Sequence, residues 1–269
     1  WRLQPIIPAP LPAHPMTRPH FCHWPPGLPH RLSAPQTSLV ANLSISALRY
    51  PDADALVFFG RRISYRRLQS EAEALAGYLQ QHCGVARGDR VLLQMQNCPQ
   101  FVIAYYAILR ADAVVVPVNP MLLTEELSHV VTDSGAAVAV VAQELAERLH
   151  PLMGEDALRH AIVACYADYL GDDAHEAPDV VRAPRTDAGH AQMRPWQQAL
   201  EAGCQPAPAA AGHDDLACLP YTSGTTGQPK GCMHTHGTVM FAAIAGAYWA
   251  GAAPGQVGLL SLPLFHVTG

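Results

Sequence analysis

The sequence has 269 residues, 49% of them hydrophobic, and its formal net charge is -5. This length and apolar content allow a sizeable buried core, arranged as one large domain or two modest ones. The acidic balance and the lack of a dense basic run argue against a nucleic-acid or anionic-membrane partner and favour a small-molecule substrate.

The seven cysteines are odd in number and scattered along the sequence, with no CxxC pair. That pattern argues against a disulfide framework and against a Cys-rich zinc site. It favours a reducing, cytoplasmic setting, and association with a membrane surface stays open.

Residues 1–35 are rich in proline, as in "PIIPAPLPAHP" and "HWPPGLPHRLSAP". They lack the basic start, apolar core and cleavage site of a secretory signal, and Met16 is an alternative start of translation. We therefore expect residues 1–35 to form a disordered or non-native leader and residues 36–269 to form the folded part.

From Leu56 onward, the sequence predicts a strand pair followed by a helix. The stretches "ALVFFG" and "RRISY" are typical of two strands that turn at Gly60, and helical periodicity follows. Ser64 is a candidate N-cap of this helix and Gly84 a candidate C-terminal stop. The apolar positions that share one face of the helix are Leu68, Ala72, Leu75, Ala76 and Leu79.

Strands and helices keep alternating as far as residue 142. "DRVLLQM" predicts a short buried strand, Phe101, Tyr105 and Ile108 share one face of a second helix, and "VVVPVN" predicts the next strand. A third helix is expected to begin at Thr124, and "AAVAVVA" is the strand after it. This alternation is typical of an α/β fold with parallel sheets flanked by helices.

The composition changes between about Gly171 and Gly212, where Ala, Pro, Asp and His dominate. We expect an irregular surface excursion there, with the α/β pattern resuming at "DLACLPYTSG" and again at "VGLLSLP". The apolar stretch from Val239 to Ala253 is shorter than the roughly 20 residues needed to span a bilayer. It therefore predicts a buried helix and no transmembrane segment.

The segment "LPYTSGTTGQPKG", from Leu219 to Gly231, joins an apolar run to hydroxyl side chains, glycines and one lysine. Gly224 and Gly227 would let backbone amides approach anionic oxygens, and Lys230 would supply a mobile positive charge. The order differs from a Walker loop, because Gln228 and a proline separate Gly227 from the lysine and no hydroxyl residue follows it. From composition alone, a polar turn between two strands is the alternative.

At every position "YTSGTTGQPKG" resembles the signature loop of the adenylate-forming superfamily, which includes acyl-CoA synthetases, luciferases and peptide-synthetase adenylation domains. "GDRVLLQMQNCPQFVIAYYAILRADAVVVPVNP" resembles the early acyl-CoA synthetase region, and "LPLFHVTG" resembles the motif that follows the loop. The resemblance covers about Leu43 to Gly269. It implies the N-terminal half of an AMP-forming acyl-CoA synthetase, similar to long-chain fatty acid–CoA ligases, with a truncated form of the large N-terminal domain of these enzymes.

The resemblance also implies roles for individual residues. In the family, the loop holds the β- and γ-phosphates of ATP together with Mg²⁺. The residue matching His266 lines the pocket where the substrate carboxylate meets the α-phosphate. Lys230 and His266 are thus the expected catalytic residues, and no side chain is assigned as a metal ligand. The expected phosphate-binding positions are Thr222, Ser223, Gly224, Thr225, Thr226, Gly227 and Lys230.

The implied reaction uses ATP, Mg²⁺ and CoA to turn a carboxylic acid, expected to be a fatty acid, into its acyl-adenylate and then its thioester. Two alternatives stay open: an adenylation domain that loads a carrier protein or another acceptor, and a truncated, non-catalytic nucleotide-binding fragment. The relatives' downstream glutamate, ribose-binding aspartate and mobile C-terminal domain have no counterpart before Gly269. The resemblance therefore implies that this fragment alone is inactive.

Several histidines and one cysteine outside the loop could have either a functional or a structural role. Cys232, His234 and His236 alternate and would share one face of a strand, but three ligands from one short strand give poor tetrahedral geometry, so we expect structural roles. Thr235 or His236 is expected near the start of the next helix. His266 alone would read as a packed core histidine, and its "LPLF" context favours the site.

Overall fold

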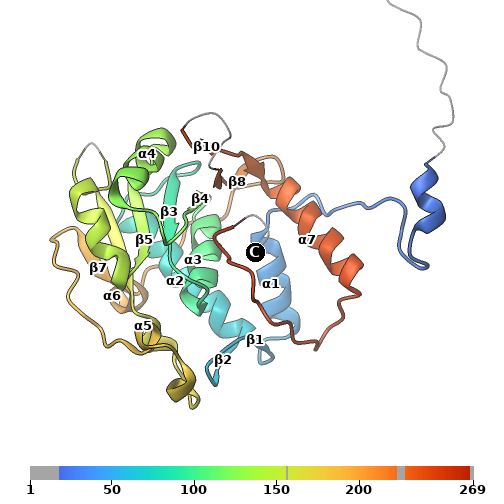
Figure 1. The fold of residues 1–269 in the computed structure, drawn as a ribbon, viewed down its shortest axis with the longest axis horizontal. Helices are drawn as coiled ribbons and strands as arrows, with labels where there is room; N and C mark the ends of the chain where they lie inside the picture. Colours follow the sequence, from blue (N-terminus) through green and yellow to red (C-terminus); the bar gives the residue numbers. More distant parts are fainter. Residues whose placement is uncertain (1–17, 156, 223–227, 267–269) are drawn as a thin grey trace, which may run out of the picture.

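A seven-stranded sheet forms the centre of the protein (Figure 1). The computed structural model describes residues 18–155, 157–222 and 228–266. Every neighbouring pair in the sheet is parallel except the edge pair β11–β8, which confirms the predicted α/β fold. The strands, in spatial order, are β11 (His234–Thr235), β8 (Leu216–Cys218), β4 (Val114–Pro117), β3 (Arg90–Gln94), β5 (Val138–Ala142), β6 (His160–Ala164) and β7 (Met193–Pro195).

The helices cover both faces of this sheet. The chain crosses from β3 to β4 in one direction and from β4 back past β3 to β5 in the other. Because such crossovers are right-handed, α3 and α4 lie on opposite faces. Contacts place α1, α2 and α6 on the side of α3 and η2 beside α4. Their bounds are α1 (Val40–Arg49), α2 (Tyr65–Gln81), α3 (Pro99–Arg110), α4 (Thr124–Ser134), η2 (Gln143–Leu152) and α6 (Trp196–Glu201).

Burial on both faces explains why the central strands are apolar throughout. Val91, Leu92 and Leu93 of β3 are fully buried, as are Val140 and Val141 of β5. A strand with one wet face would alternate apolar and polar residues, whereas a strand covered on both faces reads as a continuous apolar run. The predicted strand pair is also confirmed, as β1 (Asp54–Phe58) and β2 (Arg61–Ser64). The Ser64 side chain caps α2 by accepting from the Arg67 N–H.

The region from Gly171 to Gly212 is more ordered than its composition suggested. It contains η4 (Ala174–Glu176), α5 (Asp179–Arg182), β7 and α6, preceded by η3 (Tyr166–Tyr169). β7 extends the sheet beside β6, and Trp196 at the start of α6 is fully buried. Its indole N–H donates to the Tyr169 hydroxyl at 3.1 Å. The prediction of an irregular surface segment is therefore wrong for residues 193–201, because the buried Trp196 side chain anchors them in the core.

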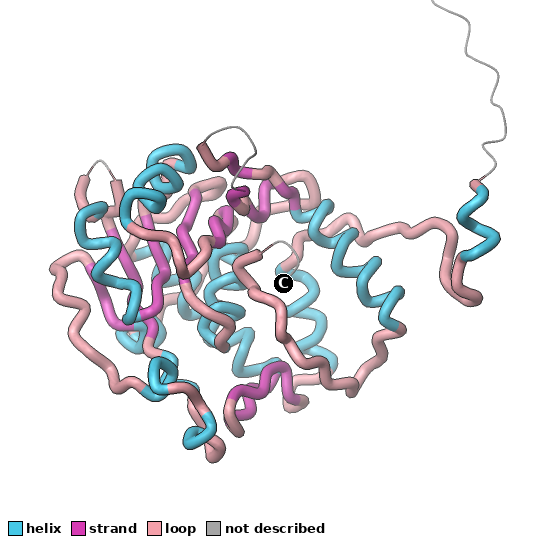
Figure 2. Tube along the Cα trace, in the orientation of Figure 1, coloured by secondary structure: helices cyan, strands magenta, loops and turns pink. Residues whose placement is uncertain are grey.

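Two expectations about the C-terminal region are also wrong. Val239–Ala253 does fall mostly within a helix, α7 (His236–Ala250), but much of that helix is exposed, including Phe241, Tyr248 and Trp249. The "VGLLSLP" segment forms no strand; Figure 2 shows residues 251–266 as a loop that crosses back over the molecule. The helix is exposed and the segment forms no strand for the same reason: few described residues pack against α7 and the segment that follows it. Among the described residues, no helix is long and apolar enough to cross a membrane.

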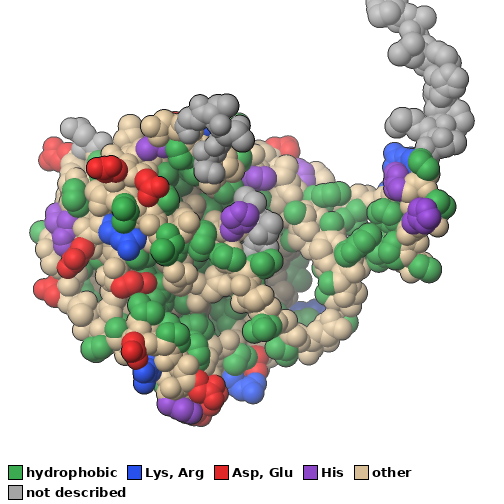
Figure 3. Space-filling model, in the orientation of Figure 1, with side chains coloured by type: hydrophobic (Ala, Val, Ile, Leu, Met, Phe, Trp, Pro, Cys, Tyr) green, Lys and Arg blue, Asp and Glu red, His purple; other side chains and the backbone are tan. Residues whose placement is uncertain are grey.

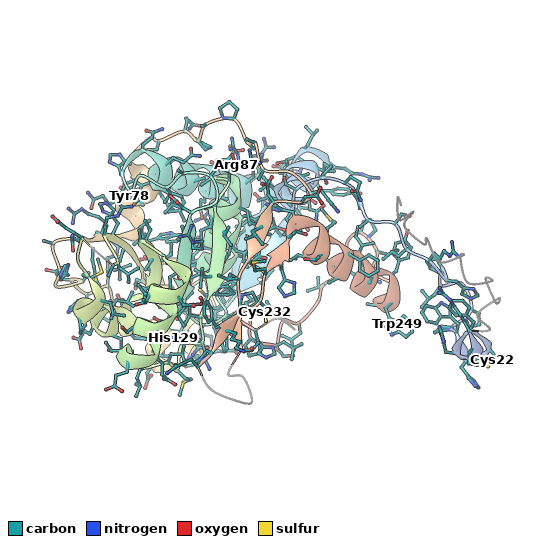
Figure 4. All side chains as sticks on the ribbon, turned by 90° about the horizontal axis from the view of Figure 1, so that it is seen from above. Cys22, Tyr78, Arg87, His129, Cys232 and Trp249 are labelled. Atoms are coloured by element: carbon teal, nitrogen blue, oxygen red, sulfur yellow. The ribbon has the colours of Figure 1, made fainter. Side chains whose placement is uncertain are left out.

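Part of the expected leader is described and packs against α7. Residues 18–35 include a 3-10 helix, η1 (Pro19–His23), and Trp24 lies edge-on to Trp249 at 5.4 Å between ring centroids. Figure 4 shows Trp249 at the end of α7 that points toward the segment carrying Cys22. The assignment of residues 1–35 as a disordered or non-native leader stays a prediction.

His236 joins α7 to α1 and gives a pH-dependent contribution to stability. The ring is buried, and its Nδ1 accepts from the Leu39 N–H at 3.1 Å, which requires an unprotonated Nδ1. Burial lowers the pKa of His236 below its usual 6.5, although nearby Asp215 and Asp112 act against the shift and His213 adds to it. The folded state thus binds this proton less readily than the unfolded state.

We therefore expect stability from His236 to be complete above pH 6.5 and to decline as the pH falls through that value. In urea unfolding between pH 7.5 and 5.0, His236→Asn should show a flatter pH dependence than the wild type. The difference in slope should approach at most about 1.4 kcal/mol per pH unit for one proton. Parallel curves for the two proteins would contradict this assignment.

Candidate functional site

A short hairpin forms the base of the loop singled out in the sequence. β9 (Tyr221–Thr222) pairs antiparallel with β10 (Lys230–Gly231), and Lys230 lies directly opposite Thr222. Side chains of directly opposite residues project to the same face, so the ammonium group and the hydroxyl belong to one surface. Both residues are exposed. The predicted sites Ser223, Gly224, Thr225, Thr226 and Gly227 lie outside the described residues.

Side chains of α4 hold both strands of this hairpin. His129 Nε2 donates to the Pro229 carbonyl at 2.8 Å, and the Tyr221 hydroxyl donates to Asp133 Oδ2 at 2.6 Å. Burial, followed by the Asp133 carboxylate, raises the pKa of Tyr221, so its hydroxyl stays protonated and remains a donor. Figure 4 labels His129 on this side of the molecule. The loop therefore enters and leaves from a base fixed to the body of the protein.

Gly231 fits this base because there is no room for a larger residue. A Cβ atom at this position would lie 2.9 Å from Leu219 Cγ and 3.2 Å from the Tyr221 ring. The Cys232 N–H then donates to the Pro220 carbonyl at 2.9 Å, which prolongs the pairing beyond β10. A side chain at position 231 would have to displace the side chains of Leu219 and Tyr221.

Asn97, just after β3, fixes the position of the segment that carries His266. Its Nδ2 donates to the Leu262 carbonyl at 2.7 Å, and its Oδ1 accepts from the Leu264 N–H at 2.8 Å. The His266 N–H donates to the Pro263 carbonyl at 3.1 Å. Both partners of Asn97 are backbone groups, so it orients the chain itself and brings His266 to the carboxyl end of the sheet.

Two cavities meet at His266. The first, of about 620 Å³, is mainly apolar and lies between α3 and α7. The second, of about 350 Å³, extends to Thr222 and Pro229 at the hairpin base. Pro117, Pro220 and His266 line both. An apolar group in the first cavity and a polar group beside the hairpin would therefore meet at His266.

The strand topology explains why these cavities lie here. The connections after β3 and β4 leave toward opposite faces of the sheet, which opens a crevice beyond the carboxyl ends of the two strands. Asn97 follows β3, and Val118 and Asn119 follow β4. Ligands of open α/β sheets bind in such crevices. The structure thus brings Thr222, Lys230 and His266 to one edge of the sheet.

The Cys232, His234 and His236 set does not converge. Cys232 is exposed, His234 lies in β11, and His236 is buried against Leu39. Within the described residues, no group of His, Cys, Asp and Glu is arranged to hold a metal ion. As expected, Thr235 and His236 start the next helix, where Thr235 caps α7 by accepting from the Thr238 N–H.

Comparison with known proteins decides the family. The family model described as "AMP-binding enzyme" matches residues 43–269, the same span as the resemblance in the sequence. The chain belongs to this family. The long-chain-fatty-acid–CoA ligase of Salmonella typhimurium is 33% identical over 86% of this chain and 43% of its own length.

A second curated relative and a solved structure are also similar to this chain. The crotonobetaine/carnitine–CoA ligase of Shigella dysenteriae is 31% identical over 77% of this chain and 37% of its own length. The inhibitor-bound N-terminal domain of FACL13 from Mycobacterium tuberculosis superposes with a TM-score of 0.62 at 29% identity, over 86% of this chain and 52% of that one. This AMP-binding family member thus spans less than half the length of the two curated relatives.

Proposed function

We propose that this chain contributes the phosphate-binding and acid-binding edge of an enzyme that activates a carboxylic acid with ATP. One observation carries the proposal. Lys230 and Thr222 lie at the hairpin base, beside the smaller cavity, and this cavity meets the larger apolar cavity at His266. Membership of the AMP-binding enzyme family supports it. In this proposal residues 36–269 are part of the AMP-binding domain and residues 1–35 lie outside it.

The first step joins the acid to the nucleotide. A carboxylate oxygen attacks the α-phosphorus of ATP, the bond from that phosphorus to the bridging oxygen breaks, and pyrophosphate leaves with the electron pair. Lys230, the Thr222 hydroxyl and the loop that they flank would stabilise the charge that develops on the pyrophosphate. His266, at the junction of the two cavities, would hold the carboxylate end of the acid.

Magnesium fits this arrangement as an ion that arrives with ATP. Mg²⁺ keeps phosphate oxygens and waters as most of its ligands and needs few from the protein. The Thr222 hydroxyl, exposed at the hairpin base, is a described oxygen that could join them. When bound, the ion would neutralise charge on the departing pyrophosphate.

The second step transfers the acyl group to a thiol. The sulfur of CoA, after losing its proton, attacks the acyl carbonyl carbon, and AMP leaves. Both curated relatives are named as CoA ligases, which favours CoA over a carrier protein as acceptor. The apolar cavity lined by Phe101, Val239 and Leu264 favours an apolar acid, in agreement with a fatty acid. We propose a cytoplasmic location, with membrane association left to experiment.

His266→Ala tests the assignment of the acid site. The matched parent is a chimera in which residues 43–269 replace the corresponding part of the Salmonella typhimurium ligase. The variant should raise the KM for a fatty acid about fivefold, from the ~1 kcal/mol of one lost hydrogen bond, and leave the KM for ATP nearly unchanged. ATP-dependent acyl-CoA formation measured at varied acid and varied ATP gives both constants. A larger change for ATP would move His266 to the nucleotide site.

A further inference from the structure

The larger of the two cavities that meet at His266 contains a second imidazole. His234 of β11 lines this cavity of about 620 Å³ and is half-buried. Among the described residues, none forms a hydrogen bond or an ion pair with the His234 ring. Thr238, in the same cavity, differs in this respect, because its hydroxyl donates to the Thr235 carbonyl at 3.0 Å. The His234 ring therefore has hydrogen-bonding capacity that the described part of the protein does not use.

The register of β11 on β8 turns the His234 ring into the cavity. His234 lies directly opposite Cys218, and opposite residues of an antiparallel pair project to the same face of the sheet. The Cys218 thiol lines the cavity and is hydrogen-bonded to Tyr105 of α3, so this face is the one that α3 covers. Pro220, where the two cavities meet, follows Cys218 by two residues. The ring thus lies roughly 7 Å from that junction along the strand direction.

The surroundings of the ring are otherwise apolar and uncharged. Among the described residues that line the larger cavity, none is Asp, Glu, Lys or Arg. Figure 3 shows charged side chains mainly on the part of the molecule away from α7, while hydrophobic side chains gather around it. In the free protein, water can pair with the imidazole. A saturated acyl chain that fills the cavity would displace this water and leave the ring unpaired, which is unfavourable.

We propose that His234 is a specificity-determining residue that hydrogen-bonds a hydroxyl group on the acyl chain of the acid. The preferred substrate is then a fatty acid with a hydroxyl group in the middle of its chain. A neutral imidazole donates through one ring nitrogen and accepts through the other, and a hydroxyl group can complement either. A site built to pair with a hydroxyl group discriminates against the analogue that lacks it. This inference rests on the proposed function, which places the acid in this cavity.

The position of the ring sets where the hydroxyl group should be. With the carboxylate at His266, a ring roughly 7 Å beyond the cavity junction faces neither the carbons next to the carboxylate nor the far end of a long chain. A hydroxyl group near the middle of a twelve-carbon acid would reach it. One at the last carbon would extend past it.

The test is calorimetric titration of the 269-residue chain with dodecanoic, 6-hydroxydodecanoic and 12-hydroxydodecanoic acids. The wild type should bind the 6-hydroxy acid about fivefold more tightly than dodecanoic acid, the gain from one hydrogen bond. The 12-hydroxy acid should show no such gain. His234→Leu should reverse the preference, because the hydroxyl group would then be buried without a partner. His234→Gln keeps a donor and an acceptor, so it is the matched control and should retain the preference.

The ring resonances of His234 should shift in NMR spectra on addition of the 6-hydroxy acid and move less with dodecanoic acid. Equal affinity of the wild type for these two acids would overturn the proposal. So would a preference that His234→Leu leaves intact. Equal weakening of both acids by His234→Leu would overturn it as well, because the ring would then bind the carboxylate. Urea unfolding of His234→Leu should match the wild type, since the ring has no described hydrogen-bond partner to lose.

Activity measurements separate this inference from the proposed function. In the chimera that carries residues 43–269, the KM for the 6-hydroxy acid should be about fivefold lower than that for dodecanoic acid. Formation of acyl-CoA from both acids with equal KM would refute the role of His234 and leave the proposed function standing. A chimera that forms no acyl-CoA, together with a chain that keeps the binding preference, would refute the proposed function and leave the role of His234 standing.

Discussion

Replacing Lys230 by alanine in the chimera is expected to slow ATP–pyrophosphate exchange by roughly 5- to 160-fold. The factor corresponds to about 1–3 kcal/mol, the range for a hydrogen bond to a charged group. Lys230 is exposed at the hairpin base opposite Thr222, so its loss removes charge from the phosphate side without opening a cavity in the core. The urea unfolding midpoint should therefore be unchanged.

Lys230→Arg is the matched control, because it keeps the positive charge and changes only its geometry. It should retain more exchange activity than the alanine variant. Exchange at the parental rate in Lys230→Ala would remove this residue from the proposed phosphate site, and equal losses in both variants would make geometry more important than charge.

Trp196→Ala is expected to lower the free energy of unfolding of the chain by about 3–5 kcal/mol, the usual cost of deleting a large buried aromatic side chain. Trp196 is fully buried and donates to Tyr169, whose hydroxyl in turn donates to Glu71 of α2. Urea unfolding followed by circular dichroism measures the loss. Trp196→Phe keeps most of the packing and removes the hydrogen bond, so it should cost about 1 kcal/mol. A loss under 1 kcal/mol in the alanine variant would mean that α6 is peripheral to the core.

The sequence predicted the central α/β layers well because periodicity there follows directly from burial. The face of α2 formed by Leu68, Leu75 and Leu79 is buried as expected, and the apolar runs of β3 and β5 lie between two helical layers. These elements have strong local patterns and tertiary contacts that agree with them. Ser64 could be identified as a cap for the same reason, since capping depends on residues three positions apart.

The misses have long-range causes. Residues 193–201 are anchored by Trp196 to partners distant in sequence, and composition carries no signal of that contact. The clamp of His129 and Asp133 on the hairpin joins α4 to residues about 90–100 positions away. Asn97 shows one usable signal, because a polar residue just after a buried strand lies at the carboxyl edge of a parallel sheet. Burial of α7 was inferred from its composition alone, and burial requires a partner that the described residues do not supply.

The most direct test of the account is the acid-dependent release of AMP, measured for the 269-residue chain and for the chimera with ATP, Mg²⁺, CoA and a panel of fatty and aryl acids. Positioning can lower a barrier by roughly 7–11 kcal/mol when all groups are in place, and this chain spans 43% and 37% of the length of the two curated relatives. The account predicts that the chimera releases AMP and forms acyl-CoA, and that the chain by itself neither turns over nor binds ATP tightly. Release of AMP by the chain alone at a rate typical of enzymes, or a folded chimera with no acid-dependent release, would contradict it.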